Sequence, residues 1–149
     1  MGVELTPSGT RGVKIPNIPR VLRKPLFKLA AWLMRRGGAP LVNVTTVGAK
    51  SGQPHTVPLS AFREGDDAWL VVASFGGAAK HPAWYHNMAK NPDKVRIEIG
   101  KRKLKVQPES LKGEEREKAW QRIVAEAPNY ADYQEKTDRE IPVVVLEES

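Results

Sequence analysis

The sequence contains no cysteine among its 149 residues. This absence excludes disulfides, thiolate metal sites and cysteine nucleophiles, and it suits a reducing cytoplasm. Long apolar runs are also missing, because no stretch reaches the roughly 18 apolar residues that a membrane-spanning helix needs. The first residues lack the apolar core of a secretory signal. We therefore expect a soluble, cytoplasmic protein.

Acidic residues are nearly absent from the first 40 positions, which hold eight basic residues and a single acid, Glu4. Positions 41–149 hold sixteen residues of each sign and are neutral. The net charge of +7 therefore belongs to the N-terminal part, and the neutral body argues against a nucleic-acid-binding protein. We divide the chain into a basic leader with a helix, residues 1–40, and a compact domain, residues 41–149.

The first 19 residues are rich in proline, glycine and threonine and are expected to form a loose leader. The next segment, 21–36, has leucines at helical spacing on one side and lysine and arginine on the other, which predicts a basic amphipathic helix. Through residues 20–36 this helix either lies on the anionic inner face of the plasma membrane or packs on the domain. The sequence leaves both interpretations open.

The compact domain alternates short strands with helices. Strands are expected at 41–47, 56–63 and 68–74, with the last two forming a hairpin. The pattern then predicts a helix at 82–88, a hairpin of 95–99 with 104–107, a helix at 114–127 and a central last strand at 141–146. Because the strands come mostly as antiparallel hairpins, we expect an α+β fold built on an antiparallel barrel.

Residues 76–87 combine a glycine pair, a basic turn and an aromatic helix start. Glycines allow close approach of a ligand, and a helix N-terminus presents N–H groups to an anion. Neighbouring helix positions differ by about 100°, so Trp84 and Tyr85 are not expected to enter the same core, and one should face a cavity. The segment indicates one wall of a site for a flat anion.

A second segment, Gly48-Ala49-Lys50-Ser51-Gly52-Gln53-Pro54, forms a tight loop between two strands. Its lysine, hydroxyl and glycine-exposed amides are the donors that phosphate oxygens require. An ordinary turn with a solvated lysine explains the loop equally simply, and the glycine spacing is not that of a P-loop. Tyr130 and Tyr133 lie three residues apart and either cover a site or pack on the barrel. The three histidines lack metal-ligand spacing, so no metal is expected.

Taken together, segments 48–59 (GAKSGQPHTVPL), 73–87 (ASFGGAAKHPAWYHN), Asn91-Pro92 and 130–145 (YADYQEKTDREIPVVV) resemble the deazaflavin-dependent nitroreductase family. Members of that family are split β-barrels, related to FMN-binding barrels, that bind coenzyme F420. This deazaflavin carries a phosphate and an oligoglutamate tail. The resemblance therefore implies a split β-barrel fold and F420 as the cofactor.

The resemblance also implies which residues form the site. It gives the phosphate to Lys50, Ser51 and Gly52, with a strand beside the cofactor formed by Thr56, Val57, Pro58 and Leu59. It lines the ring with Ala73, Ser74, Gly76 and Gly77, and caps the pocket with Lys80, Trp84, Tyr85, Asn87 and Tyr130. It places Tyr130 and Tyr133 beside the substrate. The candidate catalytic residues are Tyr130, Tyr133 and Ser74, and the sources considered for a proton are water, Tyr130 and Ser74. Ala49 and His55 stand where basic residues are frequent in the family, which implies weaker or differently arranged phosphate contacts.

The implied reaction is hydride transfer from reduced F420 to a small hydrophobic, electron-poor acceptor such as a quinone, a nitroaromatic compound or an activated enone. A cofactor that performs the difficult step explains the lack of an acid–base dyad. The alternative is a barrel that binds or carries a deazaflavin or flavin without turnover. A basic-arm lipid- or nucleic-acid-binding protein is disfavoured. A homodimer is a candidate assembly.

Overall fold

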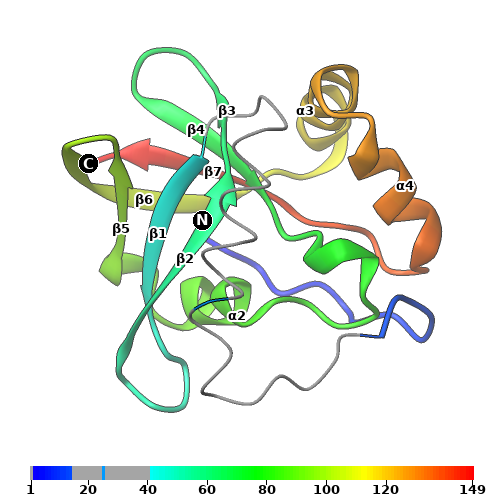
Figure 1. Ribbon diagram of the computed structural model, residues 1–149, viewed down its shortest axis with the longest axis horizontal. Helices are drawn as coiled ribbons and strands as arrows, with labels where there is room; N and C mark the ends of the chain where they lie inside the picture. Colours follow the sequence, from blue (N-terminus) through cyan, green and yellow to red (C-terminus); the bar gives the residue numbers. More distant parts are fainter. Residues whose placement is uncertain (1, 15–24, 26–40) are drawn as a thin grey trace.

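The computed structural model describes residues 2–14, 25 and 41–149. Its centre is a seven-stranded antiparallel sheet in the order β2-β1-β5-β6-β7-β4-β3, which curls into a half-barrel (Figure 1). The strands are β1 (Leu41–Val47), β2 (Pro54–Ser60), β3 (Phe62–Arg63), β4 (Ala68–Val72), β5 (Val95–Ile99), β6 (Arg102–Ser110) and β7 (Val143–Glu148). The helices of the described part are α2 (Ala83–Lys90), α3 (Gly113–Glu126) and α4 (Asn129–Lys136), with the short 3₁₀ turns η1 (Phe75–Gly77) and η2 (Pro92–Lys94).

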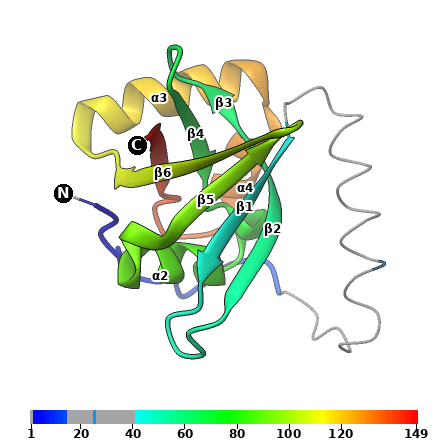
Figure 2. The ribbon, with the colours of Figure 1, turned by 90° about the vertical axis from the view of Figure 1, so that its left-hand side faces the viewer.

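The split barrel arises from the two edges of the sheet. Strand β2 pairs only with β1 and β3 pairs only with β4, so these two strands stand at opposite ends of the strand order. Yet a single residue, Ala61, separates them in sequence, and it is 1% exposed. The sheet must therefore curl until its two edges meet at Ala61 (Figure 2). The expected α+β split barrel is confirmed.

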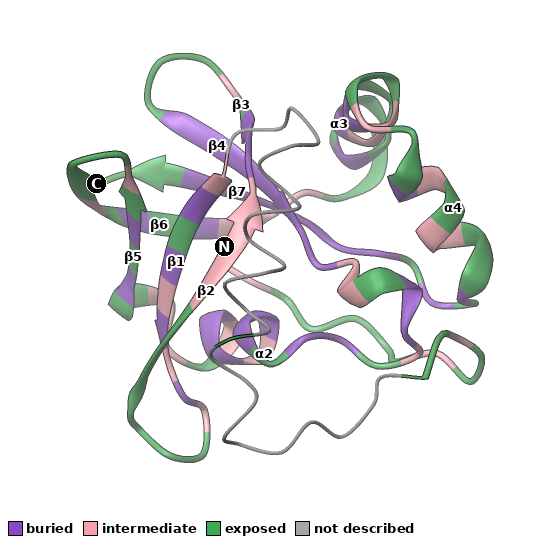
Figure 3. Ribbon diagram, in the orientation of Figure 1, coloured by how far each residue is buried: buried purple, intermediate pink, exposed green. Residues whose placement is uncertain are grey.

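Apolar side chains cover both faces of the middle of this sheet. All five residues of β4 are buried, with Trp69 and Val71 in the core inside the barrel and Leu70 and Val72 in a second core under α3 and α4 (Figure 3). Strand β7 lies between β6 and β4, as its continuous apolar run predicts. Each fully buried aliphatic side chain contributes about 1.5–3 kcal/mol, so the two cores hold the barrel and helices together.

One strand prediction was wrong in its pairing. Residues 56–63 were expected to form one strand in a hairpin with 68–74. Only β3 makes that hairpin, whereas residues 54–60 form β2 and pair with β1. The β-branched and apolar character is continuous through the segment, so the sequence alone does not reveal the break at the buried Ala61. The hairpin of β5 with β6 and the helices α2 and α3 agree with expectation.

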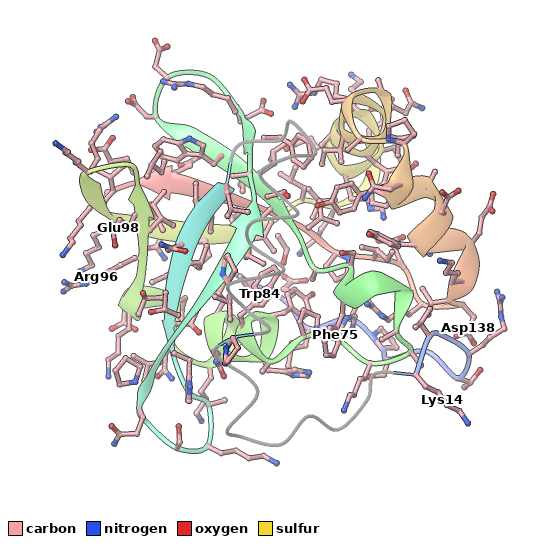
Figure 4. All side chains as sticks on the ribbon, viewed as in Figure 1. Lys14, Phe75, Trp84, Arg96, Glu98 and Asp138 are labelled. Atoms are coloured by element: carbon pink, nitrogen blue, oxygen red, sulfur yellow. The ribbon has the colours of Figure 1, made fainter. Side chains whose placement is uncertain are left out.

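The N-terminal segment 2–14 packs on the barrel and is not the loose leader expected from its composition. The N–H groups of Gly9 and Val13 donate to the carbonyls of Ala79 and Gly77, at 2.7 and 3.0 Å. Thr10 and Arg11 donate their N–H groups to the Asp138 carboxylate at 2.8 and 2.9 Å (Figure 4). Partners at least 64 residues away satisfy this backbone, so local composition could not predict its order. The amphipathic helix expected at 21–36 lies outside the described residues, except for Pro25.

Candidate functional site

Side chains of helix α2 anchor the loop between β1 and β2, which was expected to hold the phosphate. The amide oxygen of Asn87 accepts the N–H of Ala49 at 2.9 Å, and its amide nitrogen donates to the Thr46 hydroxyl at 3.0 Å. One turn further on, Asn91 donates to the carbonyl of Val47 at 3.2 Å. Because Asn87 is only 7% exposed, these bonds are shielded from water and hold the loop in one conformation.

The anchored loop presents unpaired donors to solvent. The N–H of Gly52 donates to the carbonyl of Gly48, and the N–H of Gln53 donates to the Ser51 hydroxyl. Within the described part of the chain, the N–H groups of Lys50 and Ser51 have no acceptor, and both side chains are exposed. One ammonium and two backbone amides form a donor set that fits a phosphate group. The Ser51 hydroxyl lies 3.2 Å from His55 Nε2 and is therefore already within reach of a partner.

The segment predicted to line the ring has an unusual backbone. Phe75, Gly76 and Gly77 follow one another with φ of 45°, 64° and 86°. Left-handed conformation is open to glycine but costs a non-glycine residue such as Phe75 about 1–3 kcal/mol. A Cβ on Gly77 would lie 2.8 Å from the carbonyl oxygen of Tyr133, so no side chain fits between η1 and α4. This loop persists only because its surroundings hold it.

Arg139, which the sequence pattern did not single out as a site residue, holds this loop through several hydrogen bonds. Its side chain is 3% exposed, and it donates from Nε to the carbonyl of Ala78 at 2.8 Å. Its Nη1 donates to the carbonyl of Ala73 at 3.1 Å and its Nη2 to that of Ser74 at 2.8 Å. Burial lowers the pKa of Arg139 from its ordinary value, but a guanidinium keeps its charge at any physiological pH.

His81 extends this hydrogen-bonded group to the N-terminal segment. Arg139 Nη1 lies 3.1 Å from His81 Nδ1, and a guanidinium can only donate, so Nδ1 is the accepting nitrogen. The proton therefore sits on Nε2, which donates to the carbonyl of Thr6 at 2.8 Å. Burial is the main cause that lowers the pKa of His81, and the ring is neutral near pH 7.

Trp84 and Tyr85 both lie in the core inside the barrel, so the expectation that one of them faces a cavity was wrong. They are 6% and 0% exposed, and their rings pack edge to face at 6.3 Å. The N-terminal segment covers the side of α2 that would otherwise be open, and the Tyr85 hydroxyl donates to the carbonyl of Glu4. Their role as cofactor contacts stays a prediction.

The two tyrosines of α4 lie together but differ in exposure. Their rings pack at 90° with centroids 5.6 Å apart, and Tyr130 also packs against Phe62 at 5.8 Å. Tyr130 is 8% exposed, and burial raises its pKa, against a smaller lowering effect of its hydrogen bond to Ser60. Tyr133 is half-buried, so its ring is partly accessible to a substrate.

The remaining predicted site residues divide by exposure. On β2, Thr56 is exposed, while Val57, Pro58 and Leu59 are half-buried. Around η1, Gly76 and Lys80 are exposed, Ser74 is half-buried, and Ala73 is buried. The structure thus joins the Lys50 loop to α2 through Asn87, and η1 to α4 through Gly77.

Two surface hollows elsewhere on the described residues are less suited to a polyanion. One, of about 640 Å³, lies between residues 11–13 and α4, and another, of about 790 Å³, lies between α3 and the sheet. Both are lined by charges of both signs, and neither includes a residue expected at the cofactor site. Among residues 2–14 and 41–149, no cluster of histidine and carboxylate side chains could hold a metal ion, and no helix could cross a membrane.

Comparison with known proteins shows which family the chain belongs to. The family model for F420H(2)-dependent quinone reductases matches residues 30–148. An F420H(2)-dependent quinone reductase of Mycobacterium tuberculosis is 44% identical over 114 residues, which cover 74% of this chain and 74% of that protein.

Two solved structures are also similar to this chain. One, described as the F420-H2-dependent reductase FDR-A, is 46% identical, with a TM-score of 0.65 over 72% of this chain and 94% of that one. The other, described as a domain-swapped dimer, is 38% identical, with a TM-score of 0.65 over 84% of this chain and 98% of that one. The chain belongs to the F420H(2)-dependent quinone reductase family, and it is an oxidoreductase that uses coenzyme F420.

Proposed function

We propose that this protein transfers a hydride from reduced F420 to a quinone, with the phosphate of the cofactor held in the β1–β2 loop. The observation that carries this proposal is the loop itself, in which Asn87 fixes the backbone while the N–H groups of Lys50 and Ser51 have no acceptor among the described residues. The family supplies the chemical class of the acceptor. Nitroaromatic compounds and activated enones are further electron-poor substrates to be compared with it.

The residues divide into three roles. Lys50 and Ser51 neutralise and orient the phosphate, and Gly52 allows the turn with its φ of 69°. The left-handed backbone at Gly76 and Gly77 keeps side chains away from the ring. When bound, reduced F420 supplies the hydride, so the chain needs only to hold ring and acceptor in contact and to exclude water.

Tyr133 and Ser74 are proposed to border the acceptor, because both are half-buried rather than buried. Tyr130 has a raised pKa and holds its proton more tightly than an ordinary tyrosine. It is therefore proposed to support the ring of Tyr133 by their edge-to-face contact. Any proton for the reduced quinone then comes from Tyr133, Ser74 or water.

The direct experiment mixes the protein with reduced F420 and menadione and follows the return of the oxidised-cofactor absorbance. A rate well above the protein-free mixture is expected. Binding of F420 without such acceleration would instead support a carrier barrel. Replacing menadione by a nitroaromatic compound or a cyclohexenone at the same concentration then ranks the acceptors.

We also propose that residues 20–36 contact an anionic membrane, which would bring the enzyme to lipid-soluble quinones. The support is the sequence pattern, since each basic group near such a surface is worth roughly 1 kcal/mol. The triple variant K24E/K28E/R35E should lose binding to vesicles that contain phosphatidylglycerol. The control variant K101E/K103E/K105E also reverses three exposed charges, on the β5–β6 hairpin, and should still bind these vesicles. Equal binding by both variants would contradict the proposal.

A homodimer is proposed as the assembly, because a relative of known structure is described as a domain-swapped dimer. Light scattering during size-exclusion chromatography should give twice the mass of the 16.5 kDa chain. A mass of one chain across the working concentration range would exclude it.

A further inference from the structure

The buried guanidinium of Arg139 has no acidic partner in the part of the chain that the structure describes. No carboxylate lies within ion-pair distance of it. Its donors go instead to three carbonyl groups and to His81. A buried charge is costly unless hydrogen bonds compensate for lost water. The carbonyls that compensate here all belong to the segment expected to line the cofactor ring.

These carbonyls flank the strained part of the segment. Ala73 and Ser74 precede the left-handed run Phe75–Gly77, and Ala78 follows it directly. A planar guanidinium, with its fork of five N–H donors, can bind both ends of the run at once. Arg139 therefore fixes the distance across the turn.

At the start of the loop, the N–H of Ala73 donates to the carbonyl of Pro142 at 3.0 Å, and the remaining contacts from outside the loop act on its later part. Val13 donates to the carbonyl of Gly77, and Gly9 donates to that of Ala79. Helix α4 closes against Gly77. Among the described side chains, only Arg139 donates to the carbonyls of Ala73 and Ser74, where the chain leaves β4. Within the turn, the N–H groups of Gly77 and Ala78 donate to the carbonyls of Ser74 and Phe75. Arg139 adds the side-chain donors that join the start of the turn to its end.

We propose that Arg139 is a positioning residue for the cofactor: it holds the backbone of residues 73–78 in the left-handed conformation that receives the deazaflavin ring. This inference rests on the proposed function. Arg139 touches neither phosphate nor acceptor in this scheme and acts through the loop. Its loss should therefore weaken binding of the ring and leave the phosphate contacts at Lys50 unchanged.

The test compares R139K with a matched control, R116K. Arg116 is also buried, at 5% exposed, and also donates to a carbonyl, that of Ile141 at 2.6 Å, but it lies on α3. Lysine keeps the charge in both variants and loses the planar fork. Both should lose some stability, so urea unfolding is measured first and all assays use conditions in which each variant is folded.

The first readout is hydrogen exchange of backbone amides in the protein alone. Exchange of the amides of residues 74–79 should become at least about tenfold faster in R139K, which corresponds to about 1.4 kcal/mol. R116K should leave these amides as in the wild type. Unchanged exchange in folded R139K would overturn the proposal without reference to any cofactor.

The second readout is binding, with F420 and with its riboflavin-like fragment that lacks phosphate and glutamates. R139K should weaken both ligands by the same factor, about tenfold, whereas K50A should weaken F420 alone. A loss confined to intact F420 would show that Arg139 acts on the phosphate and would contradict the proposal. If R139K does not fold, R139Q, which keeps a planar donor, is assayed with the same expectations. Failure of wild-type protein to bind F420 would instead reject the proposed function.

Discussion

At the scale of single residues, Asn87 shows how one side chain can hold the backbone of a predicted binding loop. Its amide is nearly buried and divides its two hydrogen-bonding groups between Ala49 and Thr46. An amide side chain can accept and donate at once, which a carboxylate or an ammonium cannot do. The exposed Lys50 next to Ala49 is then displayed on a backbone that does not need to be ordered when an anion binds.

Replacement of Lys50 by alanine should weaken F420 binding and reduce its dependence on salt. The lost ammonium contributes a charge-assisted contact, typically about 1.5–3 kcal/mol, or about ten- to hundredfold in affinity. Fluorescence titration at low and high salt measures both effects. K101A, an exposed lysine at the far hairpin, serves as the control and should change neither. Unchanged affinity in K50A would move the phosphate site elsewhere.

Asp138 ties the N-terminal segment to the domain in a way that acid should undo. Hydrogen bonds, above all from the Thr10 hydroxyl, lower the pKa of Asp138 to about 2, from 3.8. As the pH falls, the Asp138 carboxylate is therefore protonated in the unfolded chain before it is protonated in the folded one. Its contribution to the free energy of unfolding is present above pH 3.8 and is lost as the pH falls toward 2.

The difference in unfolding free energy between wild type and D138N should therefore shrink as the pH falls from about 5 to about 2. Urea titrations at a series of pH values measure it. D66N is the control, because the Asp66 carboxylate accepts no hydrogen bond from the described residues. If the difference in unfolding free energy stays constant with pH, the Asp138 carboxylate does not stabilise the fold in this way.

At the scale of elements, the contact between η1 and α4 depends on a missing side chain. The two approach so closely that a Cβ on Gly77 would lie 2.8 Å from Tyr133 O and 3.1 Å from Lys136 Cβ. Helix α4 carries Tyr130 and Tyr133, and η1 carries the ring-lining glycines. The spacing between the two proposed halves of the pocket is therefore set at this glycine.

G77A should destabilise the protein more than G100A and should also weaken F420 binding. Both glycines are left-handed, with φ of 86° and 59°, so both substitutions cost the backbone term of about 1 kcal/mol. Only Gly77 adds a collision, since nothing lies within 4 Å of a Cβ at Gly100. Unfolding midpoints and F420 titrations compare the pair. Equal losses of stability and of F420 affinity in both variants would mean that α4 moves away from the added Cβ without cost.

At the scale of the whole molecule, the N-terminal segment acts as a strap across the barrel. The carbonyls of Gly2, Glu4 and Thr6 accept hydrogen bonds from Ser110, Tyr85 and His81, each at least 75 residues further along the chain. The strap thus closes over α2 and leads into residues 15–40. Removing the whole N-terminal part would disturb the core as well as any membrane contact.

Deletion of residues 2–14 should lower the free energy of unfolding by roughly 2–4 kcal/mol, because His81 and Tyr85 lose their partners. Urea unfolding measures this loss. A double-mutant cycle identifies its cause: Y85F should cost about 1 kcal/mol in the full chain and almost nothing in the deleted one. An equal cost of Y85F in both backgrounds would show that the strap does not act through Tyr85.

Much of the fold and part of the site could be predicted from the sequence. The β5–β6 hairpin, helices α2 and α3 and the central β7 follow from periodicity and turn residues, which are local signals. The switch at Ala61, the packing of both Trp84 and Tyr85 in one core and the order of residues 2–14 depend on partners distant in sequence. Arg139 had only a weak signal, a basic residue just before an apolar strand.

The sequence by itself determined the family, the antiparallel barrel and the two loops predicted to bind the cofactor, because glycines, turn residues and apolar spacing act over a few neighbouring positions. Only the tertiary structure decided what holds those loops. Asn87 reaches Ala49 from another element, and Arg139 reaches Ala73 across 66 residues. A buried polar group must find its partners wherever the folded chain places them, and that placement is a property of the packed molecule.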